Sequence, residues 1–250
     1  TYNTLELTSG RMAKVARGDV MVGALGHRQA LFGYSGHIPE KVQAGDVLQV
    51  LNIGGVANLT YVGAGADGEG GDLVAFDCGP GNALLDDWCL RRTGRPVDVD
   101  GRLAAAGRVD ETLVAELLAH PFFALPAPKS LDRNAFSAAA VERLSTEDGA
   151  ATLTAFTAQA IAAGLRLLPE RPRTLVVAGG GAHNPTMLAM IAARTNTPIV
   201  TASEIGWSTD FLEAQAFAHL AVRHLEGLPL SFPGTTGVKA PRRGGVLAKA

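Results

Sequence analysis

The 250-residue chain has little of several features that mark common classes of protein. It contains two cysteines, Cys78 and Cys89, too few for the disulfide framework of a secreted protein, so we expect a reducing, cytoplasmic compartment. Its 22 Lys and Arg residues nearly balance its 24 Asp and Glu residues, which leaves no basic surface for nucleic acid or for an anionic membrane. Neither is therefore expected as a partner.

Long hydrophobic runs and several signature motifs are also missing. No apolar stretch reaches the roughly 20 residues that a membrane-spanning helix needs. The opening residues, TYNTLELTSGRM, lack the apolar centre of a signal peptide. The phosphate loop G-x-x-x-x-G-K-[ST] does not occur, and the six histidines show no metal-ligand spacing, so the sequence names no metal ligands.

Glycine, by contrast, is abundant, with 30 residues, as is typical of an α/β enzyme with tight turns and close backbone approaches. Residues 48–53 and 56–62, LQVLNI and VANLTYV, flank Gly54-Gly55 and predict a tight antiparallel hairpin whose turn uses positive φ angles. Residues 73–77, LVAFD, predict a third strand, so the three form an antiparallel meander.

The remaining pattern alternates between helix and strand. A strand at 174–178, a helix starting at Pro185 and a strand at 197–203 predict a parallel βαβ unit with a right-handed crossover. A meander followed by helices and this unit is typical of the nucleotide lobe of actin-like ATPases and sugar kinases. The fold class is therefore α/β, with a mixed sheet flanked by helices. Further helices are expected at 82–94, 111–120, 147–169 and 210–227.

Two glycine clusters are candidates for nucleotide binding. Gly54-Gly55 is either a simple hairpin turn or a loop whose backbone amides approach phosphates. Gly179, Gly180 and Gly181 stand between a buried strand and a helix that Asn184 can cap. Three consecutive glycines are more than a turn requires, and a nucleotide lying on this backbone would explain them. Packing is the alternative.

Asp77, in AFDCGPGN, is the candidate catalytic carboxylate. At the end of a strand it would project into a crevice at the edge of the sheet, with Gly79 and Gly81 leaving room for a substrate. The alternative is a turn in which Asp77 accepts a hydrogen bond from its own backbone. Cys78 is interpreted as a small buried thiol. Lys129 and Arg133 are ordinary loop cations, or anion-binding groups if their loop faces the crevice.

Taken together, several segments resemble one family, the anhydro-N-acetylmuramic acid kinases of peptidoglycan recycling. They occur in the family's order and cover about four-fifths of the chain. The matching segments are LNIGGVANLT, FDCGPGNALLDDW, VDVDG, HPFFALPAPKSLDRNAF, ATLTAFTAQAI, VVAGGGAHNP and DFLEAQAFAHLAVRHLEGLP.

The resemblance implies an ATP- and Mg²⁺-dependent kinase that opens the 1,6-anhydro ring and phosphorylates O6, with a possible homodimer as its assembly. It assigns the catalytic base to Asp77. It assigns ATP binding to Gly54, Gly55, Asn58, Gly179, Gly180, Gly181 and Asn184, and substrate binding to Gly79, Gly81, Asn82, Lys129 and Arg133. Asp86 and Glu213 match family positions for which a structural role is expected.

The first part of the chain departs from the family pattern. The family's opening phosphate loop, G-T-S-x-D-G, has no counterpart here, and its D-F-R-x-x-D and GGxGAP patterns are replaced by VGALGHRQALFGYSGHIPEKV. We therefore predict that residues 1–47 are the remnant of a first lobe and that residues 48–250 form the nucleotide-binding second lobe with a C-terminal tail. Two alternatives stay open: a truncated, non-catalytic nucleotide-binding relative, or an actin-like sugar kinase with another substrate.

Overall fold

The computed structural model describes residues 7–8, 11–12, 47–64, 72–209 and 212–247. Its main element is a five-stranded mixed sheet in the order β5-β4-β3-β6-β7. The first three strands are antiparallel neighbours, and β3, β6 and β7 are parallel, which confirms both the meander and the βαβ unit. The strands are β3 (Leu48–Ile53), β4 (Val56–Val62), β5 (Leu73–Pro80), β6 (Leu175–Ala178) and β7 (Ile199–Thr201); β1 (Leu7–Thr8) and β2 (Arg11–Met12) form a separate antiparallel pair.

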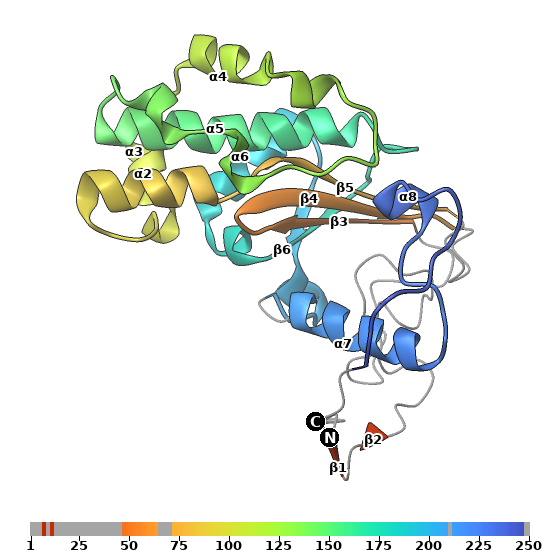
Figure 1. Cartoon of the computed structure of the whole chain (residues 1–250). Helices are drawn as coiled ribbons and strands as arrows, with labels where there is room; N and C mark the ends of the chain where they lie inside the picture. The colour runs from red at the N-terminus through yellow and green to blue at the C-terminus, as the bar shows by residue number, and fades with distance from the viewer. Residues whose placement is uncertain (1–6, 9–10, 13–46, 65–71, 210–211, 248–250) are drawn as a thin grey trace.

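Helices cover both faces of this sheet. Figure 1 shows α2, α3, α4, α5 and α6 on one face and α7 on the other. This layering confirms the α/β class with a mixed sheet flanked by helices. The helices are α2 (Ala83–Thr93), α3 (Arg102–Ala106), α4 (Glu111–Leu118), α5 (Thr146–Leu165), α6 (Pro185–Thr195), α7 (Leu212–Leu225) and α8 (Pro233–Thr236). Short 3₁₀ turns are η1 (Val99–Gly101), η2 (Pro121–Ala124), η3 (Arg133–Ala135), η4 (Ala138–Val141), η5 (Gly180–His183) and η6 (Ala202–Ile205).

The central helix α5 packs closely because small residues face its neighbours. A Cβ added at Gly149 would lie 2.3 Å from Cζ2 of Trp88, and one added at Gly164 would lie 2.5 Å from Cβ of Cys78. Trp88 is fully buried on α2, and its indole N–H donates to the carbonyl of Thr146. Small residues thus let α5 lie close to both α2 and β5.

The two faces of the sheet bury different sets of residues, as strand alternation requires. On β3, Leu51 and Ile53 belong to the core under the helices α2 to α6. Leu48 and Val50 belong to a second core that includes Trp207 and side chains of α7. The two faces of β3 therefore pack against different helical layers.

The β3–β4 turn forms where it was expected, but its backbone differs from the prediction. Neither Gly54 nor Gly55 has a φ angle in the left-handed region, so the expected positive φ angles were wrong. The turn is instead held by the start of α2, since the amide of Asn82 donates to Gly54 O at 2.8 Å and that of Gly81 donates to Gly55 O at 3.0 Å. Hydrogen bonds from another segment hold this turn, so its glycines need not adopt the positive φ angles of a type I′ or II′ hairpin turn.

The structure describes only part of the two lobes into which the chain was predicted to divide. Most of residues 1–47, the expected remnant of a first lobe, lie outside the described residues. So do residues 210–211, where the last helix was predicted to begin, and the side chain of Glu213. The division into lobes stays a prediction. Among the described helices, none is both long enough and apolar enough to cross a bilayer.

Candidate active site

The candidate residues gather at one edge of the sheet. β3 and β6 are parallel, and β5 has the same direction because β4 is antiparallel to both β3 and β5. The carboxyl ends of the three strands therefore meet at the edge where Gly54, the end of β5 and Gly179 follow in sequence. In open α/β sheets, ligands bind outside this edge.

Three polar side chains form a row across adjacent strands at this edge. Asn52 of β3 pairs with Asn58 of β4, and Asn58 pairs with Asp77 of β5. Paired residues share a face of the sheet, and alternation places this row on the side opposite the core of Leu51 and Ile53. All three side chains are partly exposed. The row places an amide, a second amide and a carboxylate on one surface.

Asn52 is the member of this row that the sequence prediction missed. A Cβ added at Gly179 would lie 2.5 Å from Asn52 Oδ1, and one added at Gly54 would lie 4.0 Å from its Nδ2. The Asn52 carboxamide therefore lies between the two glycine segments. A polar residue in an otherwise apolar strand run, LQVLNI, was the signal that could have identified it.

Asp77 is held by a distant loop and not by its own turn. The amide of Leu131 donates to Asp77 Oδ2 at 2.7 Å, a partner far away in sequence, so the structure does not show the local turn that was the alternative. The strand also runs past Asp77 to Pro80, with a bulge opposite Ala57 and Asn58. Burial raises the pKa of the Asp77 carboxyl, and the Leu131 hydrogen bond opposes this rise.

Cys78 is the extra residue in this bulge and points into the core. It is fully buried, and its thiol donates to the carbonyl of Ala57 at 3.2 Å. Burial raises the pKa of the thiol, with the charge of Asp77 contributing in the same direction. A protonated thiol is a poor nucleophile, so the prediction of a small buried thiol is confirmed.

Gly79 packs against the helical layer. A Cβ added there would lie 2.5 Å from Cβ of Ala160 on α5, so packing accounts for this glycine without a substrate. Gly81 is similarly tight, because an added Cβ would lie 2.2 Å from the carbonyl oxygen of Gly54. Their predicted contacts with the substrate stay predictions.

Replacing Gly79 by alanine is expected to lower the free energy of unfolding by about 1–3 kcal/mol, because the added methyl group overpacks the contact with Ala160. Urea unfolding followed by circular dichroism measures this loss. Adding Ala160→Gly should recover part of it by making room. A Gly79→Ala protein that is as stable as the unsubstituted chain would contradict the packing role.

The three glycines after β6 differ in their surroundings. Gly179 has a φ of 78° and Gly181 is buried, with an added Cβ 2.5 Å from Cγ2 of Ile53. Gly180 is exposed, and its nearest neighbour to an added Cβ is Nδ2 of Asn82 at 3.3 Å. Asn82 Nδ2 in turn donates to the carbonyl of Ile53. The β3–β4 turn, Asn82 and the glycine segment are thus in direct contact.

Asn184 caps α6, as predicted. Its side chain accepts a hydrogen bond from the amide of Met187 at 2.9 Å, and Pro185 follows it in the first turn. The residue is buried, and its Oδ1 lies against Gly101 of η1. Capping explains this side chain, and a contact with ATP stays a prediction.

The two loop cations have protein partners. Lys129 donates from Nζ to the carbonyl of Phe122 at 3.0 Å and lies 4.3 Å from the centre of the Phe122 ring. Arg133 forms an ion pair with Asp87 of α2 at 3.1 Å, in which both side chains are more than half exposed. An exposed pair of this kind contributes roughly 0–1 kcal/mol, so Arg133 can exchange Asp87 for an anionic ligand at little cost.

Asp86, in the first turn of α2, has the most displaced pKa of the carboxyl groups near this edge. Burial and then the neighbouring charge of Asp87 raise its pKa to about 6, while Arg133 opposes the rise. A folded-state pKa above the ordinary value means that the folded chain binds more protons between pH 4 and 6. Stability therefore falls as the pH rises through this window.

Replacing Asp86 by asparagine is expected to raise Tm at pH 7.5 by about 2–4 °C, which corresponds to roughly 1 kcal/mol after allowance for the half-exposed side chain. The gain should shrink toward pH 4, where the carboxyl group is protonated. Thermal unfolding at the two pH values measures it. An equal change at both would show that ionisation is not the cause.

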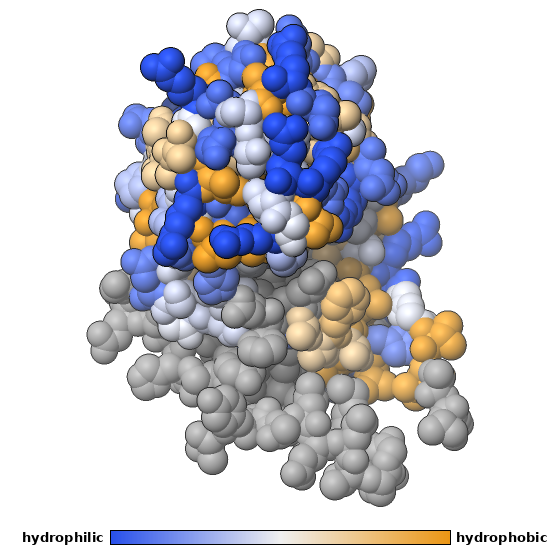
Figure 2. Space-filling model, turned by 90° about the vertical axis from the view of Figure 1, so that its left-hand side faces the viewer, coloured by the Kyte–Doolittle hydropathy of each residue, from blue (hydrophilic) through white to orange (hydrophobic). Residues whose placement is uncertain are grey.

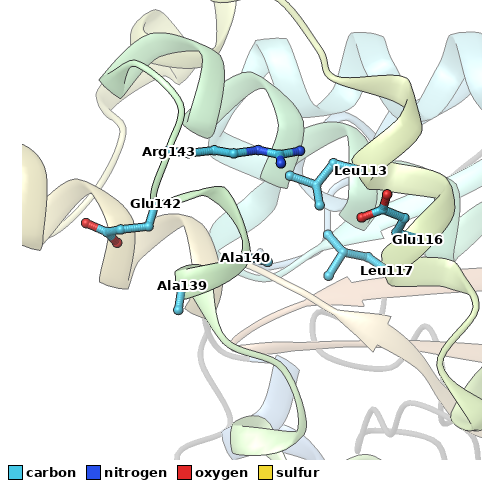
Figure 3. Close-up of a pocket in the computed structure, with 7 residues that line it drawn as sticks. All are labelled: Leu113, Glu116, Leu117, Ala139, Ala140, Glu142 and Arg143. Carbon is cyan, nitrogen blue, oxygen red and sulfur yellow. The ribbon is translucent and has the colours of Figure 1, made fainter.

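A cavity of about 450 Å³ lies away from this edge, between α4 and η4. Figure 3 shows Leu113 and Leu117 on one side of it and the η4 segment on the other, and none of the candidate residues lines it. Within the described parts of the chain, no group of three or more His, Cys, Asp or Glu side chains could hold a metal ion.

The surface beside the candidate edge is mixed in character. Figure 2 shows the side of the molecule on which α2 and the β3–β4 turn lie in Figure 1, and hydrophilic residues cover much of its upper part. The hydrophobic residues there occur in small groups between them. The upper part of this side therefore presents no large hydrophobic patch.

Comparison with known proteins identifies the relatives of this chain. Residues 37–250 match a family model described as anhydro-N-acetylmuramic acid kinase. The chain is 58% identical over 202 residues to an anhydro-N-acetylmuramic acid kinase of Methylobacterium nodulans, covering 81% of this chain and 53% of that protein. It is 50% identical over 231 residues to one of Rhizobium rhizogenes, covering 92% and 61%. The chain thus spans a little over half the length of these curated relatives.

Among solved structures, the chain is similar to an activator of 2-hydroxyisocaproyl-CoA dehydratase from Clostridium difficile with bound ADPNP, with a TM-score of 0.44 and 16% identity over 74% of this chain and 65% of that one. It is also similar to xylulose kinase from Rhodospirillum rubrum, with a TM-score of 0.41 and 15% identity over 74% and 47%.

Proposed function

The chain belongs to the anhydro-N-acetylmuramic acid kinase family, and from this membership and the geometry of the candidate edge we propose that it carries the second-lobe half of such a kinase. The proposed reaction converts ATP, water and anhydro-N-acetylmuramic acid into ADP and N-acetylmuramic acid 6-phosphate. The observation that carries the proposal is the row of Asn52, Asn58 and Asp77 beside two glycine segments.

Asp77 is proposed as the general base. Water forms a bond to the anomeric carbon of the sugar while the bond from that carbon to O6 breaks. O6 forms a bond to the γ-phosphorus as the bond to the β,γ-bridging oxygen breaks, and the proton of the water passes to the Asp77 carboxylate. Such a reaction needs mainly one positioned carboxylate and stabilisation of the phosphoryl charge.

The glycine segments are proposed to hold the nucleotide. Gly54 and Gly55 would lie against the phosphates, and Gly180 is the member of the second cluster whose exposed backbone leaves room for a ligand. Mg²⁺ is held in kinase sites by one or two carboxylates together with the phosphates of the substrate. Among the described residues no group of three or more His, Cys, Asp or Glu side chains could hold this ion, so it would be bound chiefly through the phosphates of ATP.

The compartment and assembly follow from the same proposal. A kinase that uses ATP is expected in the cytoplasm, where the two free thiols, Cys78 and Cys89, would stay reduced. A homodimer is expected from the family resemblance and can be checked by light scattering.

The deciding experiment incubates the purified chain with Mg-ATP and anhydro-N-acetylmuramic acid and looks for the 6-phosphate by mass spectrometry. In water enriched in ¹⁸O, the heavy oxygen should appear at C1 of the product and not in its phosphate, because water attacks the anomeric carbon. ATP binding measured by calorimetry without any product would instead favour the non-catalytic nucleotide-binding alternative. Phosphorylation of other sugars alone would favour a sugar kinase with another substrate.

A further inference from the structure

A loop segment, residues 129–131, forms hydrogen bonds with Asp77 at the outer edge of β5. β5 is the first strand in the order β5-β4-β3-β6-β7, so one of its edges has no neighbouring strand in the sheet. On this edge, the amide of Asp77 donates to the carbonyl of Lys129 at 2.9 Å, and the amide of Leu131 donates to Asp77 Oδ2 at 2.7 Å. Residues 129–131 therefore hold both the backbone and the side chain of Asp77.

The segment is itself anchored through the Lys129 side chain. Its ammonium group donates to the carbonyl of Phe122 at 3.0 Å and lies over the ring of the same residue, which is buried in η2. A charge-assisted hydrogen bond and a cation–π contact with one buried residue together restrict the ammonium end of the lysine. The ammonium group of Lys129 thus lies against η2.

We propose that residues 129–131 are a positioning element for Asp77, in which the Leu131 amide fixes Oδ2 and leaves Oδ1 as the oxygen that receives the proton. The inference rests on the proposed function of Asp77 as the base. Within the described part of the chain, no hydrogen-bond donor meets Oδ1. One carboxylate oxygen is therefore fixed and the other is free to meet a water molecule.

The hydrogen bond also shifts the pKa of Asp77 in the direction that a general base requires. Burial raises the pKa of Asp77, and the Leu131 amide is the group that lowers it. A donor to the charged form favours ionisation, so this amide keeps the carboxylate ready to accept a proton. Lys129 is on this view a positioning residue that acts through the loop backbone and not a ligand of the sugar.

The test replaces the Leu131 amide by an ester, through incorporation of the α-hydroxy analogue of leucine, with Leu131→Ala as the matched control that keeps the N–H. The pKa of Asp77 is measured by carbon-detected NMR titration of the folded chain, which needs no substrate. Loss of a hydrogen bond to a charged group should raise this pKa by about 1 unit. The alanine variant should leave it unchanged.

Turnover gives the second measurement. In the ester variant, the acidic limb of the plot of kcat/KM against pH should move to higher pH by the same amount as the pKa of Asp77 measured by NMR. The plateau value of kcat/KM should fall by about tenfold. Leu131→Pro, which also lacks the N–H, replaces the ester if that variant does not fold.

Lys129→Met should lower kcat with KM for the sugar unchanged. An unchanged Asp77 pKa, an unchanged plateau in spite of a raised pKa, or a Lys129→Met effect confined to KM would each overturn the proposal. Absence of turnover in the unsubstituted chain would count against the proposed function alone, since the NMR titration still decides whether the amide controls Asp77.

Discussion

Replacing Asp77 by asparagine is expected to lower kcat by about 10²–10⁴-fold, the usual contribution of a general base. Asparagine keeps the size of the side chain and can still accept the hydrogen bond from Leu131 through its Oδ1. It cannot take a proton from water at the anomeric carbon. The fold and the nucleotide-binding glycines should therefore stay intact while the chemical step is lost.

Two measurements separate this effect from a general loss of binding. ADP release measured in a coupled assay gives kcat, and calorimetric titration gives the dissociation constant for Mg-ATP, which should change by less than about twofold because a base acts chiefly in the transition state. Asp87→Asn is the matched control, since Asp87 is an exposed carboxylate on α2 that is paired with Arg133. A large fall in ATP affinity with retained turnover would show that Asp77 serves the nucleotide and not the chemistry.

The sequence predicted the fold well because its strong signals are local. The hairpin strands flanking Gly54-Gly55 and the cap at Asn184 depend on neighbouring residues, and the structure has both. The length of α2 was also predictable from periodicity and from the stop signal at Gly94, whereas the helix predicted at 147–169 ends at Leu165. The short helix α3 was missed, because five residues, RLAAA, give too little periodicity to be recognised.

The contacts of the candidate site could not be predicted in the same way. The hydrogen bond from Leu131 to Asp77 joins residues 54 positions apart, and no local pattern encodes a partner at that distance. The same holds for Asn52, whose importance depends on its register with Asn58. The predicted φ angles of the turn at Gly54 and Gly55 were wrong for a related reason, since the amides that hold this turn come from the start of α2.

Valine substitutions in the glycine cluster after β6 should also have large effects, on ATP affinity at one position and on stability at another. Gly180 is exposed, and the atom nearest to an added Cβ is the movable Asn82 amide at 3.3 Å. Gly180→Val should therefore fold normally. If the nucleotide lies on this backbone, the branched side chain should weaken Mg-ATP binding by tenfold or more, about 1.4 kcal/mol.

Gly181→Val is the matched control for this substitution. Its added Cβ would lie 2.5 Å from Cγ2 of Ile53 in the core, so valine should destabilise the fold by about 1–3 kcal/mol or more through overpacking. Thermal unfolding and calorimetric ATP titration on both variants measure the two effects. The expected pattern is lost affinity with unchanged Tm for Gly180→Val, and lowered Tm for Gly181→Val. Unchanged ATP affinity in a folded Gly180→Val protein would show that the nucleotide does not lie on this backbone, because the one position with room for a ligand would then not touch it.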